Sequence, residues 1–91
     1  MNIVRKHIKF YGRVQGVGFR YRAEKSASIY GIKGWIRNND DGTVEMEAQG
    51  ERENIMNMMD LIKQGNFIEI EYTEERNIPL KDDEYGFNIE D

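Results

Sequence analysis

Hydrophobic and polar side chains alternate near the start of the chain. Within residues 3–14 one set of positions is apolar or glycine and the intervening set is polar: Ile8, Phe10, Gly12 and Val14 against His7, Lys9, Tyr11 and Arg13. A period of two residues is typical of a strand with one buried face. From Phe19 onward the apolar spacing becomes helical and ends at Gly31, which suits a left-handed C-terminal cap. We therefore predict a strand over 3–14 and a helix over 19–30.

The rest of the chain has the pattern of a hairpin, a helix and further strands. Residues 32–38 and 43–49 each fit a strand, and the Asn-Asp-Asp-Gly sequence between them suits a tight turn. Residues 51–64 begin with acidic side chains, carry an apolar stripe and stop at a glycine, which predicts a second helix. Residues 67–73 and 85–89 fit two more strands, joined by an acidic loop that contains the only proline.

This order of elements predicts an α+β fold, the ferredoxin-like split βαβ sandwich. Its β-α-β-β-α-β order, here followed by a C-terminal strand, places both helices on one face of an antiparallel sheet. The first two strands are then parallel with the third between them, so their C-terminal ends share one sheet edge. Residues 12–20 leave the first strand at this edge, about 9 to 10 Å from Asn38, which closes the second. We expect one small ligand to reach both.

Composition limits the size and class of the protein. With 91 residues, 38% of them hydrophobic, the chain predicts a single domain over residues 1–91. The absence of cysteine excludes disulfides, cysteine-ligated zinc and a cysteine nucleophile. No apolar run approaches a signal-peptide core or the roughly 18 residues of a membrane helix. We therefore expect a cytoplasmic protein that does not bind membranes.

Charge is distributed unevenly along the chain. Residues 1–23 carry six basic and no acidic side chains, whereas the remainder carries 7 basic and 17 acidic ones, a charge of −10 within a net −4. A basic region confined within an acidic protein favours a site for a small anion over binding to nucleic acid or anionic membranes. For Arg5 and Lys6, a solvated basic strand edge is the alternative interpretation.

The segment Gln15-Gly16-Val17-Gly18 has the composition of an anion-binding loop. Its glycines permit positive φ, so that successive amides can point inward at a helix N-terminus, which favours negative charge. Arg20, in the first helical turn, can offer planar bidentate contacts to phosphate. Neither a Walker pattern nor a complete GxGxxG occurs, so nucleotide binding has no motif support. From spacing alone, anion binding and a plain tight turn are equally good interpretations.

Two motifs resemble the signatures of one enzyme family. GRVQGVGFR at 12–20 and GWIRN at 34–38 are similar to the signatures of acylphosphatases, small ferredoxin-like enzymes that hydrolyse carboxyl-phosphate anhydrides. The resemblance extends through DGTVE at 41–45 and more loosely through YGFNI at 85–89, and so covers nearly the whole chain. The chain departs from the family at Asn66, where acylphosphatases often have proline after the glycine that ends the second helix.

The resemblance implies metal-independent hydrolysis of a small acyl phosphate to a carboxylate and inorganic phosphate, with no cofactor. It makes Arg20 the phosphate-binding catalytic arginine and Asn38 the residue that orients the attacking water; without it, Asn38 fits a turn-initiating role better. The phosphate site is completed by the backbone amides of Gln15, Gly16, Val17, Gly18 and Phe19. The chemistry is compatible, because a carboxylate with a reference pKa of about 4 leaves without a general acid. Inorganic phosphate is the expected product and competitive inhibitor.

The other polar residues are interpreted structurally. His7 has no second ligand nearby, so we predict no metal site. Arg13 and Arg22 are expected to be structural, Trp35 is expected to pack against the sheet or a helix with a minor role at the site left open, and Asn39 is the control position for Asn38.

Two other functions are weighed. RNA binding occurs in ferredoxin-like RRM domains, but the predicted third strand has two acids and no aromatic residue on which a base could stack. A phosphate-binding module without turnover is the second, because similar domains are fused within carbamoyl-phosphate-processing maturation factors. Edge strands rich in glutamate favour a monomer.

Overall fold

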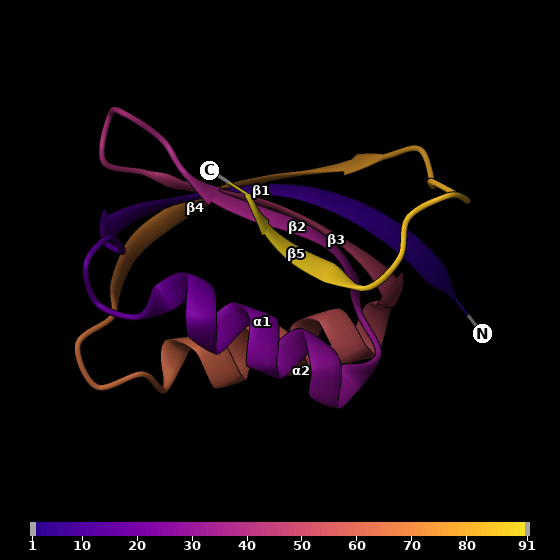
Figure 1. Cartoon of the computed structure of the whole chain (residues 1–91), viewed down its shortest axis with the longest axis horizontal. Helices are drawn as coiled ribbons and strands as arrows, with labels where there is room; N and C mark the ends of the chain where they lie inside the picture. Colours follow the sequence, from indigo (N-terminus) through magenta and orange to yellow (C-terminus); the bar gives the residue numbers. More distant parts are fainter. Residues whose placement is uncertain (1, 91) are drawn as a thin grey trace.

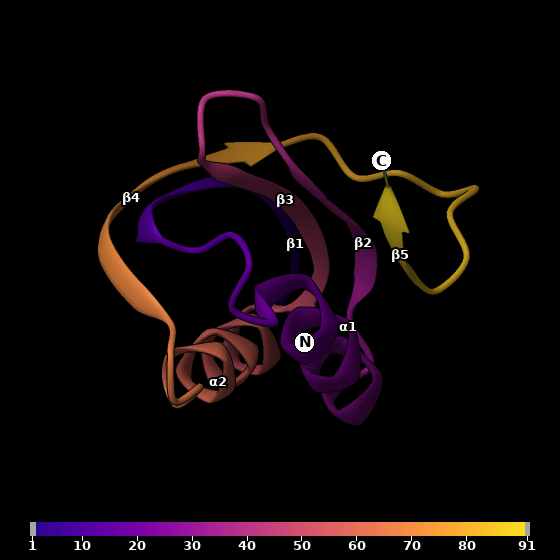
Figure 2. The ribbon, with the colours of Figure 1, turned by 60° about the vertical axis from the view of Figure 1, so that its left-hand side comes forward.

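Two helices cover one face of a curved, five-stranded sheet (Figure 1). The structure is a computed structural model and describes residues 2–90. Figure 2 shows the curvature of the sheet around the two helices. The elements, in chain order, are β1 (Ile3–Arg13), α1 (Phe19–Tyr30), β2 (Lys33–Asn38), β3 (Val44–Glu51), α2 (Arg52–Lys63), β4 (Glu69–Ile78) and β5 (Phe87–Glu90).

The strands lie in the order β4-β1-β3-β2-β5. The first four pair antiparallel, with β3 between β1 and β2, as the ferredoxin-like prediction requires. The C-terminal strand β5 is also present, but it pairs in parallel with β2, so the sheet is mixed. The connection from β4 carries the chain from one edge of the sheet to the other, and β5 then runs antiparallel to β4. The α+β ferredoxin-like fold is confirmed, with this addition.

Strand β4 is longer than predicted, and helix α2 ends close to its predicted end. Strand β4 runs to Ile78 rather than residue 73, because the backbone of its last, exposed residues continues to pair with β1 as far as Arg5. Side-chain alternation gives no signal for such a stretch. Helix α2 ends without a proline: the amides of Gln64 and Gly65 turn back to carbonyls in the last helical turn at 3.2 and 3.1 Å.

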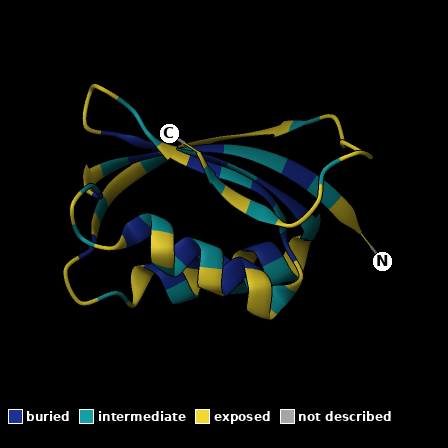
Figure 3. Cartoon of the chain, viewed as in Figure 1, coloured by how far each residue is buried: buried dark blue, intermediate teal, exposed yellow. Residues whose placement is uncertain are grey.

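The core lies between the helices and the sheet (Figure 3). The alternation along β1 is confirmed, because Ile8 and Phe10 are fully buried and face the helices. The apolar stripe of α2 is confirmed in the same way, with all four of its members buried: Ile55, Met58, Met59 and Ile62. No helix among residues 2–90 is long and apolar enough to cross a membrane.

Arg5 differs from the expectation of a solvated strand edge, which is wrong for this residue. Its side chain is 1% exposed, with Nη2 2.9 Å from Glu47 and Nη1 2.7 Å from Glu84. Strand β1 lies inside the sheet, and Glu84 comes from the 79–86 connection, which covers Arg5 on the face away from the helices. Lys6 is partly exposed, with Nζ 3.7 Å from Glu75.

Candidate functional site

The connection between β1 and α1 contains two residues in the left-handed region. Gly16 has φ 71° and Gly18 has φ 79°, a conformation that costs other residues about 1 to 2 kcal/mol. A Cβ added at either position would meet no atom within 4 Å, so these glycines are needed for their backbone conformation rather than for packing. Gly18 is also the N-cap of α1, and no side chain among the described residues caps this helix. The first-turn amides are therefore available to an anion.

Arg20 and Asn38 line one pocket with this loop. The pocket has a volume of about 510 Å³ and lies between the start of α1, the end of β2 and strand β5. It is lined by Val14, Gly16, Gly18, Phe19, Arg20, Tyr21, Glu24, Asn38 and Ile89. Within residues 2–90, Arg20 forms no ion pair with any carboxylate. The topology thus brings together the two side chains that the motifs single out.

Asn38, which lines this pocket, carries a hydrogen-bond acceptor without a partner in the described part of the chain. It is the last residue of β2 and pairs with Val44 of β3 through the backbone, so its position is fixed by the sheet. Its Oδ1 is buried and has no hydrogen-bond partner among residues 2–90. Buried polar atoms in proteins nearly always have a partner, so an oxygen without one at the wall of a pocket indicates a place where a ligand or an ordered water can supply the missing hydrogen bond.

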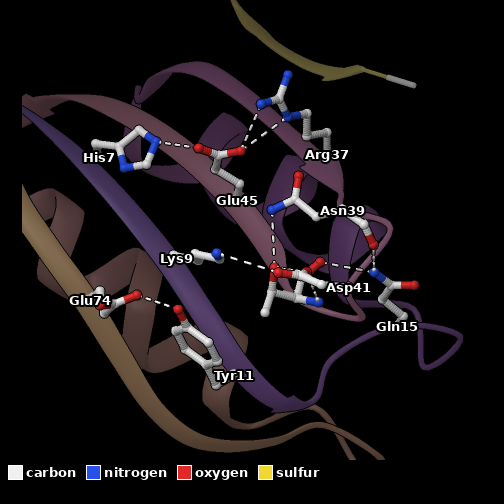
Figure 4. A network of polar contacts seen from close by, with 10 residues as sticks. His7, Lys9, Tyr11, Gln15, Arg37, Asn39, Asp41, Glu45 and Glu74 are labelled. Carbon is white, nitrogen blue, oxygen red and sulfur yellow. Dashed lines mark hydrogen bonds and ion pairs between the residues drawn. The ribbon is translucent and has the colours of Figure 1, made fainter.

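The side chain of Gln15 connects the loop to the turn that follows Asn38 (Figure 4). Its Nε2 donates to the carbonyl oxygens of Asn39 at 2.7 Å and Thr43 at 2.9 Å. The sequence predicted a role only for the backbone amide of Gln15, since no spacing shows that position 15 faces residues 39–43. Gln15 does not line the pocket, and neither does Val17, which packs against the hydrophobic core.

Hydrogen bonds also hold the β2–β3 turn in shape. Asn39 Nδ2 donates to Thr43 Oγ1 at 3.0 Å, and Asp41 Oδ1 accepts from the amide and the hydroxyl of Thr43 at 3.0 and 2.6 Å. The hydroxyl and then the amide of Thr43 are the main reasons that the pKa of Asp41 lies below its ordinary value. Asn39 is therefore a poor control for Asn38, because both its side chain and its carbonyl support the turn.

The remaining candidates lie outside the pocket. Arg22 Nε donates to the carbonyl of Leu61 at 2.6 Å and so joins α1 to α2, a structural role as predicted. Trp35 packs on the face of the sheet away from the helices, 6.4 Å from the ring of His7, with the Arg37 guanidinium 5.1 Å from its own ring. The packing of Trp35 against the sheet is confirmed, and Trp35 does not line the pocket.

A carboxylate lies on the same face of the sheet as Trp35. Glu45 accepts hydrogen bonds from Arg37 at 2.8 Å and is 2.6 Å from Nε2 of His7. Burial raises the pKa of Glu45, but the hydrogen bonds from Arg37 and His7 outweigh it and lower the pKa overall. Among residues 2–90, no group of three or more histidines and acids is placed to hold a metal ion.

Four lining residues were not predicted as part of the site: Val14, Tyr21, Glu24 and Ile89. Glu24 follows Arg20 by four residues, and this spacing places both side chains on one face of α1. The sequence therefore contained a signal from which the position of Glu24 could have been predicted. Ile89 joins the pocket only because β5 lies beside β2, which the sequence pattern does not show. The pocket therefore contains backbone amides, the cation of Arg20, the carboxamide of Asn38 and the carboxylate of Glu24. The first three can hold a phosphoryl group and orient a water toward it.

A family model, curated relatives and solved structures all relate this chain to acylphosphatases. The family model described as Acylphosphatase matches residues 6–89. The acylphosphatase of Clostridium acetobutylicum is 46% identical over 83 residues, covering 90% of this chain and 91% of its own. The crystal structure of the acylphosphatase from Bacillus subtilis matches with a TM-score of 0.86 at 31% identity, over 94% of this chain and 97% of that one.

A larger protein contains a similar unit. Full-length HypF, in a phosphate- and nucleotide-bound crystal structure, matches with a TM-score of 0.88 at 29% identity. The match covers 99% of this chain but only 12% of HypF, so the likeness concerns this one unit.

Proposed function

This chain belongs to the acylphosphatase family of hydrolases acting on acyl phosphates, and we propose that the pocket at the start of α1 is its catalytic centre. The observation that carries the proposal is the shared pocket of Arg20, free of any carboxylate partner among residues 2–90, and the unpartnered Oδ1 of Asn38. A cation beside the positive end of a helix is unfavourable unless an anion compensates it, which supports an anionic ligand here.

The phosphoryl group of the substrate binds to the backbone amides of residues 15–19 and to Arg20. Positive φ at Gly16 and Gly18 turns the backbone so that these amides can face a common point, and the open space above both glycines admits the phosphate oxygens. The guanidinium adds charge-assisted, bidentate hydrogen bonds, each worth roughly 1.5 to 3 kcal/mol. These donors stabilise the equatorial oxygens as charge develops on them.

Asn38 orients the attacking water. Its Oδ1 accepts a hydrogen bond from the water, so that a lone pair of the water faces phosphorus in line with the acyl oxygen. A bond forms between the water oxygen and phosphorus, the bond from phosphorus to the acyl oxygen breaks, and the acyl group leaves as a carboxylate. The proton of the water passes to an oxygen of the phosphoryl group itself. The proposed mechanism requires neither a metal ion nor a cofactor.

Phosphate release from benzoyl phosphate tests this assignment. We expect Arg20→Ala to abolish turnover and Asn38→Ala to reduce it by about 10² to 10³-fold, by analogy with the deletion of a single oxyanion donor. Arg13→Ala is the matched control for a nearby exposed cation, and Asn66→Ala is the control for an exposed amide. Both controls should retain wild-type rates, and the wild-type enzyme should keep its rate in excess chelator. Undiminished turnover in Arg20→Ala contradicts the proposal.

A phosphate-binding module without turnover is the second candidate, favoured by the likeness to one unit of the phosphate-bound HypF. Competitive inhibition by inorganic phosphate is expected of the enzyme. Phosphate binding at Arg20 with no release of phosphate from benzoyl or acetyl phosphate would indicate the module instead.

We further propose that residues 1–91 act as one cytoplasmic, monomeric domain that does not bind nucleic acid. The edge strand β4 carries four glutamates, which oppose pairing with a second copy. On β3, Glu45 and Glu47 occupy the sheet face on which an RRM would stack bases, and both pair with arginines. Elution as a dimer, or salt-sensitive RNA binding at micromolar protein, contradicts these statements.

A further inference from the structure

The catalytic pocket is larger than a phosphoryl group requires, and its remaining wall differs in chemistry from the loop. Beyond Arg20 and Asn38, that wall consists of Tyr21, Glu24 and Ile89. We propose that these three residues bind the acyl group of the substrate. We further propose that Glu24 selects against acyl groups that carry a negative charge of their own, in addition to the charge of the phosphoryl group. This inference rests on the proposed function, because it takes the phosphoryl position at Arg20 as its starting point.

The direction of the acyl group follows from the helix. Glu24 lies four residues after Arg20, which corresponds to about 6 Å along α1 on the same face. Val14 and Phe19 are buried and close the inner side of the pocket. The acyl group of a bound substrate therefore extends from the phosphoryl position outward along the helix. A benzoyl group bound in this way places its para substituent about one helical turn from phosphorus, next to Glu24.

The two apolar side chains suit an aromatic or branched acyl group. Tyr21 is 77% exposed although it lines the pocket, so its ring is free to contact a ligand. Ile89 is half-buried on β5 and belongs to the same wall. A ring held between them is expected to gain an aromatic contact that acetyl phosphate is too small to make.

Among the described residues, the charge of Glu24 is not neutralised by an ion pair. Within residues 2–90 its carboxylate forms no ion pair, even with Arg20 one turn away. It also lines the adjoining groove of about 720 Å³ beside α1, which Lys33 at the start of β2 lines as well. Within the described part of the chain, Glu24 is the one lining residue that the pocket and the groove share, so it lies where a long acyl group would pass from one to the other. Repulsion between two partly solvated charges several ångströms apart corresponds to about a five- to tenfold loss in binding. Uncharged or cationic acyl groups avoid this loss.

A pair of near-isosteric substrates isolates the charge effect. We expect kcat/KM for 4-carbamoylbenzoyl phosphate to exceed that for 4-carboxybenzoyl phosphate by about five- to tenfold at low salt, and by less as salt screens the repulsion. Glu24→Gln reduces this preference to within about twofold. Glu53→Gln, which neutralises an exposed acid in the first turn of α2, retains the full preference and is the matched control.

A second variant tests the apolar wall. Tyr21→Ala lowers the ratio of kcat/KM for benzoyl phosphate to that for acetyl phosphate by about three- to tenfold. Equal rates on the two para-substituted substrates in the wild type, or a full preference in Glu24→Gln, overturn the role of Glu24. An unchanged ratio in Tyr21→Ala overturns the aromatic contact. Turnover that survives Arg20→Ala is a separate outcome, because it rejects the phosphate assignment whatever the acyl preference.

Discussion

Replacing Gln15 with leucine removes both hydrogen bonds between the 15–20 loop and the β2–β3 turn while keeping a side chain of similar size. Each bond is worth about 0.5 to 1.5 kcal/mol net, so the two together are worth about 1 to 3 kcal/mol. Both acceptors keep another partner, because the carbonyl of Thr43 also accepts from Asn39 N at 2.9 Å and that of Asn39 from Gly42 N at 3.2 Å. No buried carbonyl is left unpaired, so the loss of unfolding free energy should stay within about 1 to 3 kcal/mol.

The effect on turnover should be larger than the effect on stability suggests. The side chain of Gln15 is directed to the β2–β3 turn rather than into the pocket, so it acts by positioning: it holds the loop that carries the phosphate-binding amides, its own among them, against the turn that follows Asn38. Small displacements of reacting groups reduce rates by up to about 10²-fold. We expect kcat for benzoyl phosphate to fall about ten- to a hundredfold, with a much smaller change in the inhibition constant of inorganic phosphate.

Urea unfolding and steady-state kinetics on the same samples measure both effects. Gln64→Leu, at an exposed position after α2, is the control and should change neither quantity appreciably. A Gln15→Leu protein that loses stability as expected but keeps its kcat would refute the positioning role, since the loop and Asn38 would then be aligned without this connection.

Two further predictions concern the sheet and the turn. Arg5→Met leaves Glu47 and Glu84 as partly buried carboxylates without their cation, so urea unfolding should show a loss of about 3 to 5 kcal/mol; a loss below about 1 kcal/mol would show that the buried ion pairs are not required. Asp41 has a lowered pKa, so its ionised form stabilises the fold; that contribution is fully present above its ordinary pKa of 3.8 and is lost as pH falls through the lowered value. Unfolding free energies of the wild type and Asp41→Asn should therefore converge between about pH 5 and pH 2, and parallel pH profiles would contradict this.

Much of the fold could be predicted because its signals are local. Alternation in β1, the helical spacing that ends at Gly31 and the stripe of α2 each reflect burial of one face, and all three agree with the structure. The order of the elements then places the glycine loop and Asn38 at one sheet edge, and the pocket contains both.

The missed features depend on contacts between distant segments. Arg5 is buried by Glu84, which lies 79 residues later, and no local pattern in β1 indicates that the 79–86 connection passes over it. Likewise, the acceptors of Gln15 lie 24 and 28 residues away, and Ile89 reaches the pocket only through the parallel pairing of β5 with β2. Side-chain periodicity reports which face of an element is buried, but not which segment covers it.

The central claim is that the 15–20 loop and Arg20 hold the phosphoryl group, and amide NMR shifts on titration with inorganic phosphate test it most directly. We predict that the largest saturable shifts occur at the amides of residues 15–20, that Arg20→Ala removes them and that Arg13→Ala leaves them intact. Saturable shifts centred instead on the opposite face of the sheet, around Arg37 and Glu45, would contradict the account.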